Sequence, residues 1–298
     1  MKQIAEKIGA DFDGKELASL LRHLGCSRNI ITKLKRGGLT VNGLPAPTNQ
    51  ILHSGDLVEI TLEDEKTPIA NPQLRVNIAY EDEDLLIANK PPFMPVHQSL
   101  KHYDDTLANF FAAHCPECAF RAINRLDRNT SGLCVIAKNQ LAAARLSDAK
   151  GKKPQKTYYA IAGGLISNDG VIEAPIARVN DSMILREVRS DGQFAKTNYR
   201  VLAADENASL VEIHLETGRT HQIRVHFSYI GHALLGDDLY GGDCTLLDRQ
   251  ALHCGEINLL HPITQKRLTV TAPFPNDIQQ AVKTLFPDFT HDFLLDKT

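Results

Sequence analysis

The sequence contains no tryptophan, and aromatic residues make up only 6% of its 298 residues. The core must therefore rest on Leu, Ile, Val and Ala. No apolar run approaches the roughly 18 residues that a membrane-spanning helix needs, which excludes an integral membrane protein. The first residues, Met1 to Lys7, lack the apolar core and small-residue cleavage site of a secretory signal. We therefore expect a globular protein of the cytoplasm.

Cysteine is scarce and unevenly spaced, with six residues in the chain. In a sequence without an export signal, this favours reduced thiols over a disulfide scaffold. Cys115 and Cys118 form a single CxxC pair beside His114. Zinc needs four ligands, and no second pair follows at zinc-finger spacing. We expect a surface turn with two free thiols, whose role the sequence leaves open.

Acidic residues are absent between Leu17 and Gly55, although the formal net charge of the whole chain is only -3. The basic residues of this window are Arg22, Arg28, Lys33, Lys35 and Arg36. A stretch of one sign in a nearly neutral protein is typical of a surface that docks a polyanion. A solvated helix face, the alternative, normally mixes both signs. The window therefore predicts contact with nucleic acid.

The apolar pattern of this window predicts a compact module. One helix spans residues 17–24 and is closed by Gly25, and a second begins at Ser27. Strands follow at residues 39–41 and 57–60, with Asn42 and Gly43 forming a hairpin turn after the first. Residues 13–63 resemble the S4 RNA-binding domain. The segments that carry the resemblance are Ser27-Arg28, Lys33 to Gly38, Val41 to Gly43 and Ser54 to Val58.

Two prolines in the segment Lys66 to Pro72 indicate a linker. We assign an RNA-binding domain to residues 1–65, the linker to 66–74 and a catalytic domain to 75–298. In the catalytic domain we expect strands at 76–80, 85–88, 133–137, 157–162, 196–202, 210–214 and 266–270, and helices at 106–113 and 140–149. This order predicts an α+β fold with a β-rich mixed sheet and flanking helices.

The densest polar cluster, residues 124–132, leads directly into the apolar strand at 133–137. A loop that feeds a buried strand can aim side chains while the sheet fixes their position. Asp127 lies between arginines, which favours its ionised form. Taken alone, the run also fits a loop salt bridge with Thr130 and Ser131 as turn caps.

A second cluster spans residues 218–226. Arg219 or Arg224 could clamp a phosphate or carboxylate. His221 and His226 are poor metal ligands as a pair, because five residues along a helix place them about 140° apart. In a third cluster, Tyr158 and its neighbour Tyr159 point to opposite faces of a strand, so only one can enter a given pocket. A strand tyrosine by itself is usually a core residue.

Together and in this order, the clusters resemble the RluA-type family of RNA pseudouridine synthases over residues 13–285. The matching segments are Arg125 to Gly132, Lys156 to Tyr158, Gly218 to His226, Gly231-His232, Gly236-Asp237, Tyr240-Gly241, Gln250 to His253 and His261-Pro262. The chain departs from the family pattern at Asn124, where His is usual, and at Ala233, where Pro is frequent. These departures bear on the positioning of the loop and on the choice of RNA.

The resemblance implies isomerisation of uridine to pseudouridine in RNA, which needs no cofactor and no metal. It assigns the nucleophile to Asp127, without deciding between attack on the base and attack on the ribose. Tyr158 would stack on the flipped base and take the C5 proton. Arg224 would orient Asp127 through an ion pair, with Arg219 as the second candidate.

The resemblance implies further contacts to the RNA. Arg125 would fill the gap left by the flipped base or hold its phosphate, and Thr130 and Ser131 would brace the loop. The remaining substrate-binding residues are Arg219, His221 and Gln222 in the cleft, with Arg28, Lys33, Lys35 and Arg36 on the RNA-binding domain.

The partner implied is ribosomal RNA, chiefly of the large subunit, with transfer RNA as the alternative. The uridine positions and the number of target sites are not readable from the sequence, and we expect a monomer. Two other classes compete with the synthase. One is a non-catalytic RNA-binding or ribosome-assembly protein. The other is a metal hydrolase built on His214, His221, His226 and Asp237.

Overall fold

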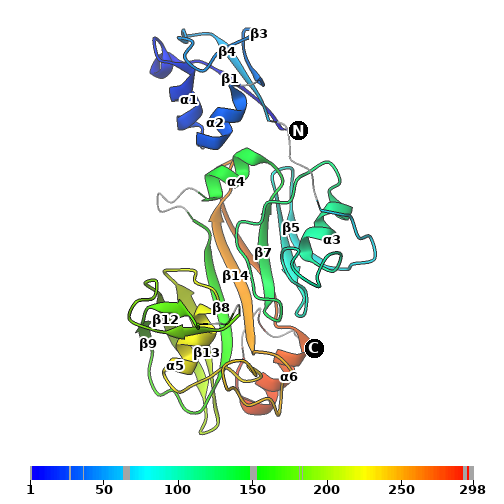
Figure 1. Cartoon of the computed structure of the whole chain (residues 1–298), viewed down its shortest axis with the longest axis vertical. Coiled ribbons are helices and arrows are strands. Elements are labelled where there is room, and N and C mark those ends of the chain that lie inside the picture. The colour runs from blue at the N-terminus through cyan, green and yellow to red at the C-terminus, as the bar shows by residue number, and fades with distance from the viewer. Residues whose placement is uncertain are drawn as a thin grey trace.

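The computed structural model describes residues 2–26, 28–35, 37–62, 68–147, 153–180, 182, 184–290 and 294. Ser27, Arg36 and the side chain of Arg28 lie outside the described part, so the expectations for them are not addressed. The chain forms a small N-terminal unit, blue in Figure 1, and a larger unit built around long central strands. No helix of the described part is long and apolar enough to cross a membrane.

The N-terminal unit packs two helices on an antiparallel sheet of order β1-β4-β2-β3. Its elements are β1 (Lys2–Lys7), η1 (Ala10–Phe12), α1 (Leu17–His23), α2 (Arg28–Leu34), β2 (Leu39–Val41), β3 (Leu44–Pro45) and β4 (Leu57–Leu62). The predicted helices and strands are present. Gly25 ends α1 with a positive φ of 85°, and the turn of Asn42 and Gly43 has φ values of 53° and 79°. These left-handed conformations explain why small turn residues stand there.

The larger unit contains a sheet of order β5-β6-β7-β14-β8-β13-β12-β9, with β15 paired to β14. Its strands are β5 (Asn77–Glu81), β6 (Leu85–Lys90), β7 (Ser131–Ala137), β8 (Gln155–Gly163), β9 (Gly170–Glu173), β12 (Lys196–Ala204), β13 (Ala208–Leu215), β14 (Leu252–Leu260) and β15 (Arg267–Thr271). A separate hairpin pairs β10 (Ile176–Arg178) with β11 (Arg186–Val188). Strand β7 runs parallel to β14, whereas the other strand pairs of the described residues are antiparallel. The predicted β-rich mixed sheet is confirmed.

Helices α3 (Leu107–His114), α4 (Gln140–Ser147), α5 (Gln222–Tyr229) and α6 (Asn276–Leu285) accompany the sheet. The predicted helices at α3 and α4 are confirmed, whereas β1, β14, α5 and α6 were not predicted. Strand β7 is buried along its whole length, as its apolar run requires. At its start Gly132 has a φ of 112°, and a Cβ there would lie 2.3 Å from the carbonyl oxygen of Cys254. Only glycine allows β14 to approach the end of the polar loop 124–132 so closely.

Helix α4 joins the two units, directly below the N-terminal unit in Figure 1. Leu141 is part of the hydrophobic cluster of the N-terminal unit. The guanidinium of Arg145 donates to the backbone oxygen of Leu24 at 2.7 Å and to that of Pro262 at 2.8 Å. Helix α4 thus connects the end of α1 to the turn between β14 and β15.

The expected surface turn at the CxxC pair is wrong for Cys115. This residue is buried directly after α3, because its thiol packs into the main hydrophobic cluster, while Cys118 is partly buried. Both are free cysteines.

Candidate active site

The loop 124–130 precedes β7 and is fastened to it at its start. The side-chain amide of Asn124 donates to the carbonyl oxygen of Leu133 at 3.1 Å, and its oxygen accepts the backbone N–H of Val135 at 2.8 Å. The residue that departs from the family pattern therefore holds the loop in place by two hydrogen bonds.

Two buried cations donate hydrogen bonds to backbone carbonyl oxygens of the loop. The ammonium group of Lys90 donates to the carbonyl oxygen of Arg128 at 3.1 Å, and Arg249 donates to that of Asn129 at 3.0 Å. Burial lowers the pKa of Lys90 to about 8. Arg249 is also bidentate to Asp277, at 2.6 and 2.9 Å. Donors held against these two carbonyl oxygens fix the backbone directly after Asp127.

The end of the loop is bound to β14 and to the residue before it. Gln250 donates to the hydroxyl of Thr130 at 3.2 Å, and the hydroxyl of Ser131 lies 2.9 Å from Nδ1 of His253. Thr130 and Ser131 are both buried. Their hydroxyls brace the loop within the protein, whereas the charged side chains of Arg125 and Asp127 line the cleft.

Asp127 lies beside an arginine from another part of the chain. The guanidinium of Arg224, on α5, donates to a carboxylate oxygen of Asp127 at 3.3 Å. Arg224 is itself bidentate to the fully buried Asp237, at 2.7 Å for both bonds, and its guanidinium lies 4.9 Å from the ring centroid of Tyr240. Asp237 therefore sets the orientation in which Arg224 meets Asp127.

His221 caps α5 in the left-handed conformation, with a φ of 57°. The hydroxyl of Tyr240 accepts the backbone N–H of Arg186 at 3.2 Å and lies 2.8 Å from Nδ1 of His221. Nε2 of the same ring lies 3.8 Å from a carboxylate oxygen of Asp127. Burial lowers the pKa of His221, which favours a neutral ring next to the carboxylate.

Tyr158 and Tyr159 take opposite sides of β8, as predicted. Tyr159 packs edge-on against Phe274 at 5.8 Å on one side of the sheet. Tyr158 lies in the wall of the cleft that contains Asp127, and its hydroxyl hydrogen-bonds with Cys254. Burial raises the pKa of Tyr158 well above its usual value, so the phenol is protonated at rest.

These side chains meet in one cleft of about 1080 Å³. It is lined by residues of the loop, β8, the turn before α5, and β14, including Arg125, Asp127, Tyr158, Arg219, His221 and Arg224. A drug-sized pocket has roughly 300–1,000 Å³, so this space accommodates a nucleotide and its neighbours. Arg125 is exposed at the cleft.

Arg219 and Gln222 line the cleft and also make hydrogen bonds within the protein. Arg219 donates through Nε to the carbonyl oxygen of Phe194 at 3.0 Å, so the contact with Asp127 belongs to Arg224. The amide of Gln222 makes four hydrogen bonds within the protein and stabilises the turn before α5. Its partners are the hydroxyl of Thr217, the N–H of Arg219, the carbonyl of Lys196 and the hydroxyl of Thr197.

The residues proposed for a metal hydrolase have other partners. Both ring nitrogens of His226 are engaged, one with the hydroxyl of Thr197 and one with the carbonyl oxygen of Ala174. Both carboxylate oxygens of Asp237 bind Arg224, and His214 is exposed beside Glu212. Within the described residues, this set does not converge on a common point.

Comparison with known proteins gives a consistent result. A family model for RNA pseudouridylate synthases matches residues 84–229. An "uncharacterized RNA pseudouridine synthase YhcT" of Bacillus subtilis (strain 168) is 41% identical over 285 residues, which cover 92% of this chain and 94% of that protein. The chain belongs to the RNA pseudouridylate synthase family. The ribosomal large subunit pseudouridine synthase D of Pasteurella multocida (strain Pm70) is 38% identical over 258 residues, 80% of each chain.

The fold agrees with this membership. The solved structure of human RNA pseudouridylate synthase domain containing 1 has a TM-score of 0.57 and 26% identity, and the match covers 74% of this chain and all of that one. The protein is thus an RNA pseudouridine synthase, an isomerase that acts on uridine in RNA. The expectation of a synthase is confirmed, and the non-catalytic and hydrolase alternatives are set aside.

Several residues of the site were missed by the sequence analysis. Lys90 and Arg249 carry charge into the core, but Lys90 ends an apolar strand and Arg249 lies between Asp248 and Gln250, and neither forms a motif with its neighbours. Asp237 and Tyr240 belong to matching segments, yet their spacing to Arg224 does not reveal the pair or the ring contact. A buried charged side chain needs a partner of opposite charge or a hydrogen-bond acceptor. A search for such partners is the signal that could have found these residues.

Proposed function

We propose that this synthase modifies uridines of large-subunit ribosomal RNA and that Asp127 is its nucleophile. The observation that carries the proposal is the position of Asp127. A braced loop presents its carboxylate in the cleft beside the Asp237-oriented Arg224, with 20% of its side chain exposed to an incoming nucleotide. A carboxylate held in this way can attack a substrate without first reorganising the site.

The target uridine must leave its stack to reach Asp127, at a cost of a few kcal/mol. The ring of Tyr158 in the cleft wall offsets part of this cost, because stacking on an aromatic face contributes about 1–3 kcal/mol per base. Arg224 holds the nucleophile in orientation and balances its charge, and exposed Arg125 occupies the space of the flipped base or binds its phosphate. With these contacts made to other parts of the nucleotide, the uracil base can turn after its bond to the ribose is cleaved and before it is rejoined through carbon.

Re-formation of the aromatic ring requires loss of the C5 proton. The hydroxyl of Tyr158 is the group we assign to this step. Its raised pKa means that it starts as a phenol, so its own proton must pass to water in the open cleft before its oxygen accepts the proton from carbon.

The N-terminal unit supplies further RNA affinity as an S4-like domain. Its support is the arrangement of α1 and α2 on a small sheet, the acid-free window, and the exposure of Lys33 and Lys35. Helix α4 packs against this unit, and its last residues, Leu146 and Ser147, line the cleft. Helix α4 therefore links the N-terminal unit, where RNA would bind, to the cleft that contains Asp127.

The choice of ribosomal RNA rests on relatives such as the enzyme of Pasteurella multocida, whose name assigns it to the large ribosomal subunit. A ribosomal RNA substrate supports a cytoplasmic location, and we propose that the enzyme acts as a monomer.

The test is a map of pseudouridines in total RNA from a deletion strain and its parent. We expect specific pseudouridines to disappear from large-subunit ribosomal RNA. The wild-type gene and the Asp288→Asn gene, which changes an exposed carboxylate outside the cleft, should restore them, whereas the Asp127→Asn gene should not. Loss of sites only from transfer RNA would contradict the assigned substrate.

A further inference from the structure

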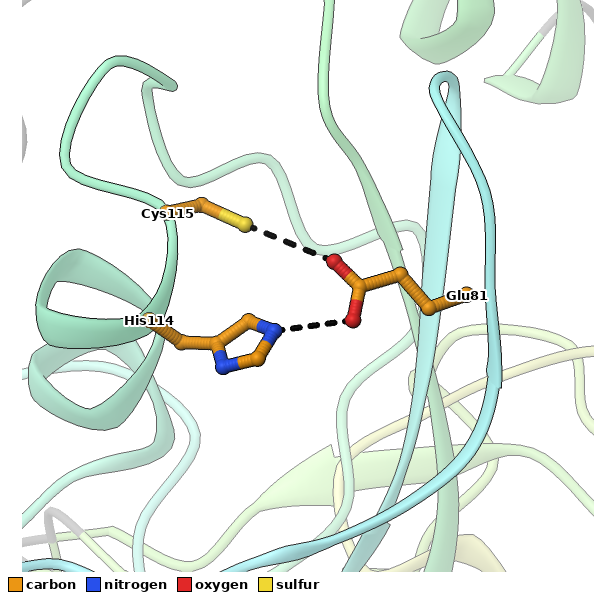
Figure 2. A group of neighbouring side chains, drawn as sticks. All are labelled: Glu81, His114 and Cys115. Carbon is orange, nitrogen blue, oxygen red and sulfur yellow. Dashed lines mark hydrogen bonds and ion pairs between the residues drawn. The ribbon is translucent and has the colours of Figure 1, made fainter.

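A second cluster of reactive side chains lies outside the cleft, where α3 ends against β5. Nε2 of His114 is 2.8 Å from one carboxylate oxygen of Glu81, and the thiol of Cys115 is 3.7 Å from the other. These ligand atoms all lie within 4.8 Å of one another. Figure 2 shows the imidazole and the thiol converging on the carboxylate from the end of α3, while Glu81 projects from the strand. None of the three lines the catalytic cleft.

A fourth donor follows three residues later. The backbone N–H of Cys118 donates to the carbonyl oxygen of Cys115 at 3.0 Å, which closes a tight turn. The thiol of Cys118 is close enough to act electrostatically on both Cys115 and Lys138, a direct partner of Glu81. The ligand atoms that lie within 4.8 Å of one another are those of Glu81, His114 and Cys115, and the thiol of Cys118 would join them through a rotation of its side chain.

We propose that Glu81, His114, Cys115 and Cys118 bind one zinc ion that fastens the end of α3 to strand β5. The donor set has two sulfurs, one imidazole nitrogen and one carboxylate oxygen, which is a four-coordinate set that zinc prefers. Calcium and magnesium require oxygen ligands and do not suit it. The short CxxC spacing supplies two ligands, and the fold adds the other two from His114 and from a strand 33 residues upstream of it.

Charge balance supports the ion. Two thiolates and one carboxylate around Zn²⁺ leave a single net negative charge. Lys138 donates to Glu81 at 2.9 Å and to the backbone oxygen of Asp82 at 2.7 Å, so its ammonium is already held beside the site. A cation in this position compensates the charge and orients the carboxylate ligand. The side chain of His114 is 35% exposed, which gives the ion a path from solvent.

The site has a structural purpose. Strand β5 forms an edge of the large sheet, and the chain that leaves Cys118 leads within six residues to Asn124, where the catalytic loop begins. A zinc ion would join this segment to the sheet edge, whereas the isomerisation itself proceeds at Asp127 without it. This inference is independent of the assigned RNA substrate.

The experiment measures metal content of the purified full-length chain by mass spectrometry after dialysis, and the absorption spectrum after loading with Co²⁺. We expect about one zinc per chain and thiolate-to-cobalt charge-transfer bands. The single variant Cys118→Ser should lose the charge-transfer bands and at least about 90% of the zinc. The double variant, which carries both Cys115→Ser and Cys118→Ser, should do the same. Cys244→Ser, which changes an exposed cysteine, and Asp127→Asn should keep both.

Two measurements keep the test decisive if the cysteine variants fold poorly. His114→Gln changes a partly exposed ligand and should weaken zinc binding without preventing folding. Chelation of wild-type protein should lower its melting temperature, and added Zn²⁺ should restore it. Wild-type protein that contains no stoichiometric zinc and binds Co²⁺ without thiolate bands would overturn the proposal. The cluster would then be a hydrogen-bonded ion pair of Glu81 with His114 and Lys138.

Discussion

At the scale of single residues, the site depends on charges that have more than one partner. Arg224 meets Asp127 with one nitrogen and Asp237 with two others. Because Asp237 is fully buried, it has no other role open to it than to hold that guanidinium. The carboxylate of Asp127, the proposed nucleophile, is therefore oriented by a chain of two ion pairs in addition to the bracing of its loop.

Replacing Asp237→Asn tests this chain. The change leaves Arg224 buried with a weaker partner, so we expect a loss of about 3 kcal/mol in the free energy of unfolding. We also expect a lower kcat, because the guanidinium is free to turn away from Asp127. Denaturant titration and single-turnover kinetics measure the two effects, and Asp238→Asn, at the exposed next residue, is the control. Wild-type kcat in Asp237→Asn would contradict the positioning role.

Replacing Tyr158→Phe separates the ring of the tyrosine from its hydroxyl. The ring remains, so the affinity for RNA should stay unchanged. Loss of the hydroxyl should lower kcat by about 10²- to 10⁴-fold, the usual range for a general acid or base. Tyr159→Phe, on the opposite side of β8, should retain kcat. If Tyr158→Phe turns over at the wild-type rate, the hydroxyl takes no part in proton transfer.

At the scale of elements, strand β14 and the residues before it hold the catalytic loop. His253 donates from Nε2 to the carbonyl oxygen of Ala272 at 3.1 Å and accepts from the hydroxyl of Ser131 through Nδ1. The second of these contacts, acceptance at Nδ1, requires a neutral ring. Burial lowers the pKa of His253 from 6.5 to about 4.

This gives the stability of the protein a pH dependence of known sign. Between pH 6.5 and about 4 the unfolded state binds the proton and the folded state does not. The contribution of His253 is therefore fully present above pH 6.5 and is lost as the pH falls through this window. Chemical denaturation at several pH values measures the free energy of unfolding against pH. In this window its slope should be shallower in His253→Asn than in wild type by up to about 1.4 kcal/mol per pH unit. His214→Asn, at an exposed site, should keep the wild-type slope.

The elements that could be predicted from the sequence are those with a local signal. The apolar run that forms β7 and the Asn42–Gly43 turn are examples. Strand β14 escaped prediction because Gly255, Glu256 and Asn258 interrupt its pattern, and its central place comes from pairing with β7 and β8. The residue types of the site were found through the motifs, but the pairing of Arg224 with Asp237 depends on tertiary contacts that no spacing encodes.

At the scale of the whole molecule, the N-terminal unit and the cleft are joined by α4. Arg145 contacts backbone oxygens on both sides of this connection. If the N-terminal unit binds RNA through phosphate contacts, affinity for the substrate will depend on salt through residues that lie outside the cleft, while the chemical step will not.

Replacing Lys35→Gln tests this division. The side chain is exposed just after α2 and lies outside the cleft lining. We expect the slope of log affinity against log salt to become less steep by roughly 0.7, the value for one phosphate on a single strand. The kcat at saturating RNA should not change. Lys283→Gln, an exposed lysine on α6, is the matched control. An unchanged salt slope in Lys35→Gln would remove this lysine from the RNA-binding surface.

The central claim is that the carboxylate of Asp127 reacts with a uridine in the cleft. The most direct measurement is single-turnover formation of pseudouridine in a ribosomal RNA fragment by purified Asp127→Asn protein, together with its affinity for that RNA. We expect no detectable product and an RNA affinity within about threefold of wild type, because the substitution keeps the shape of the side chain and removes the nucleophile. Asp288→Asn should match wild type in both. Product formation by Asp127→Asn at a rate near that of wild type would contradict the account.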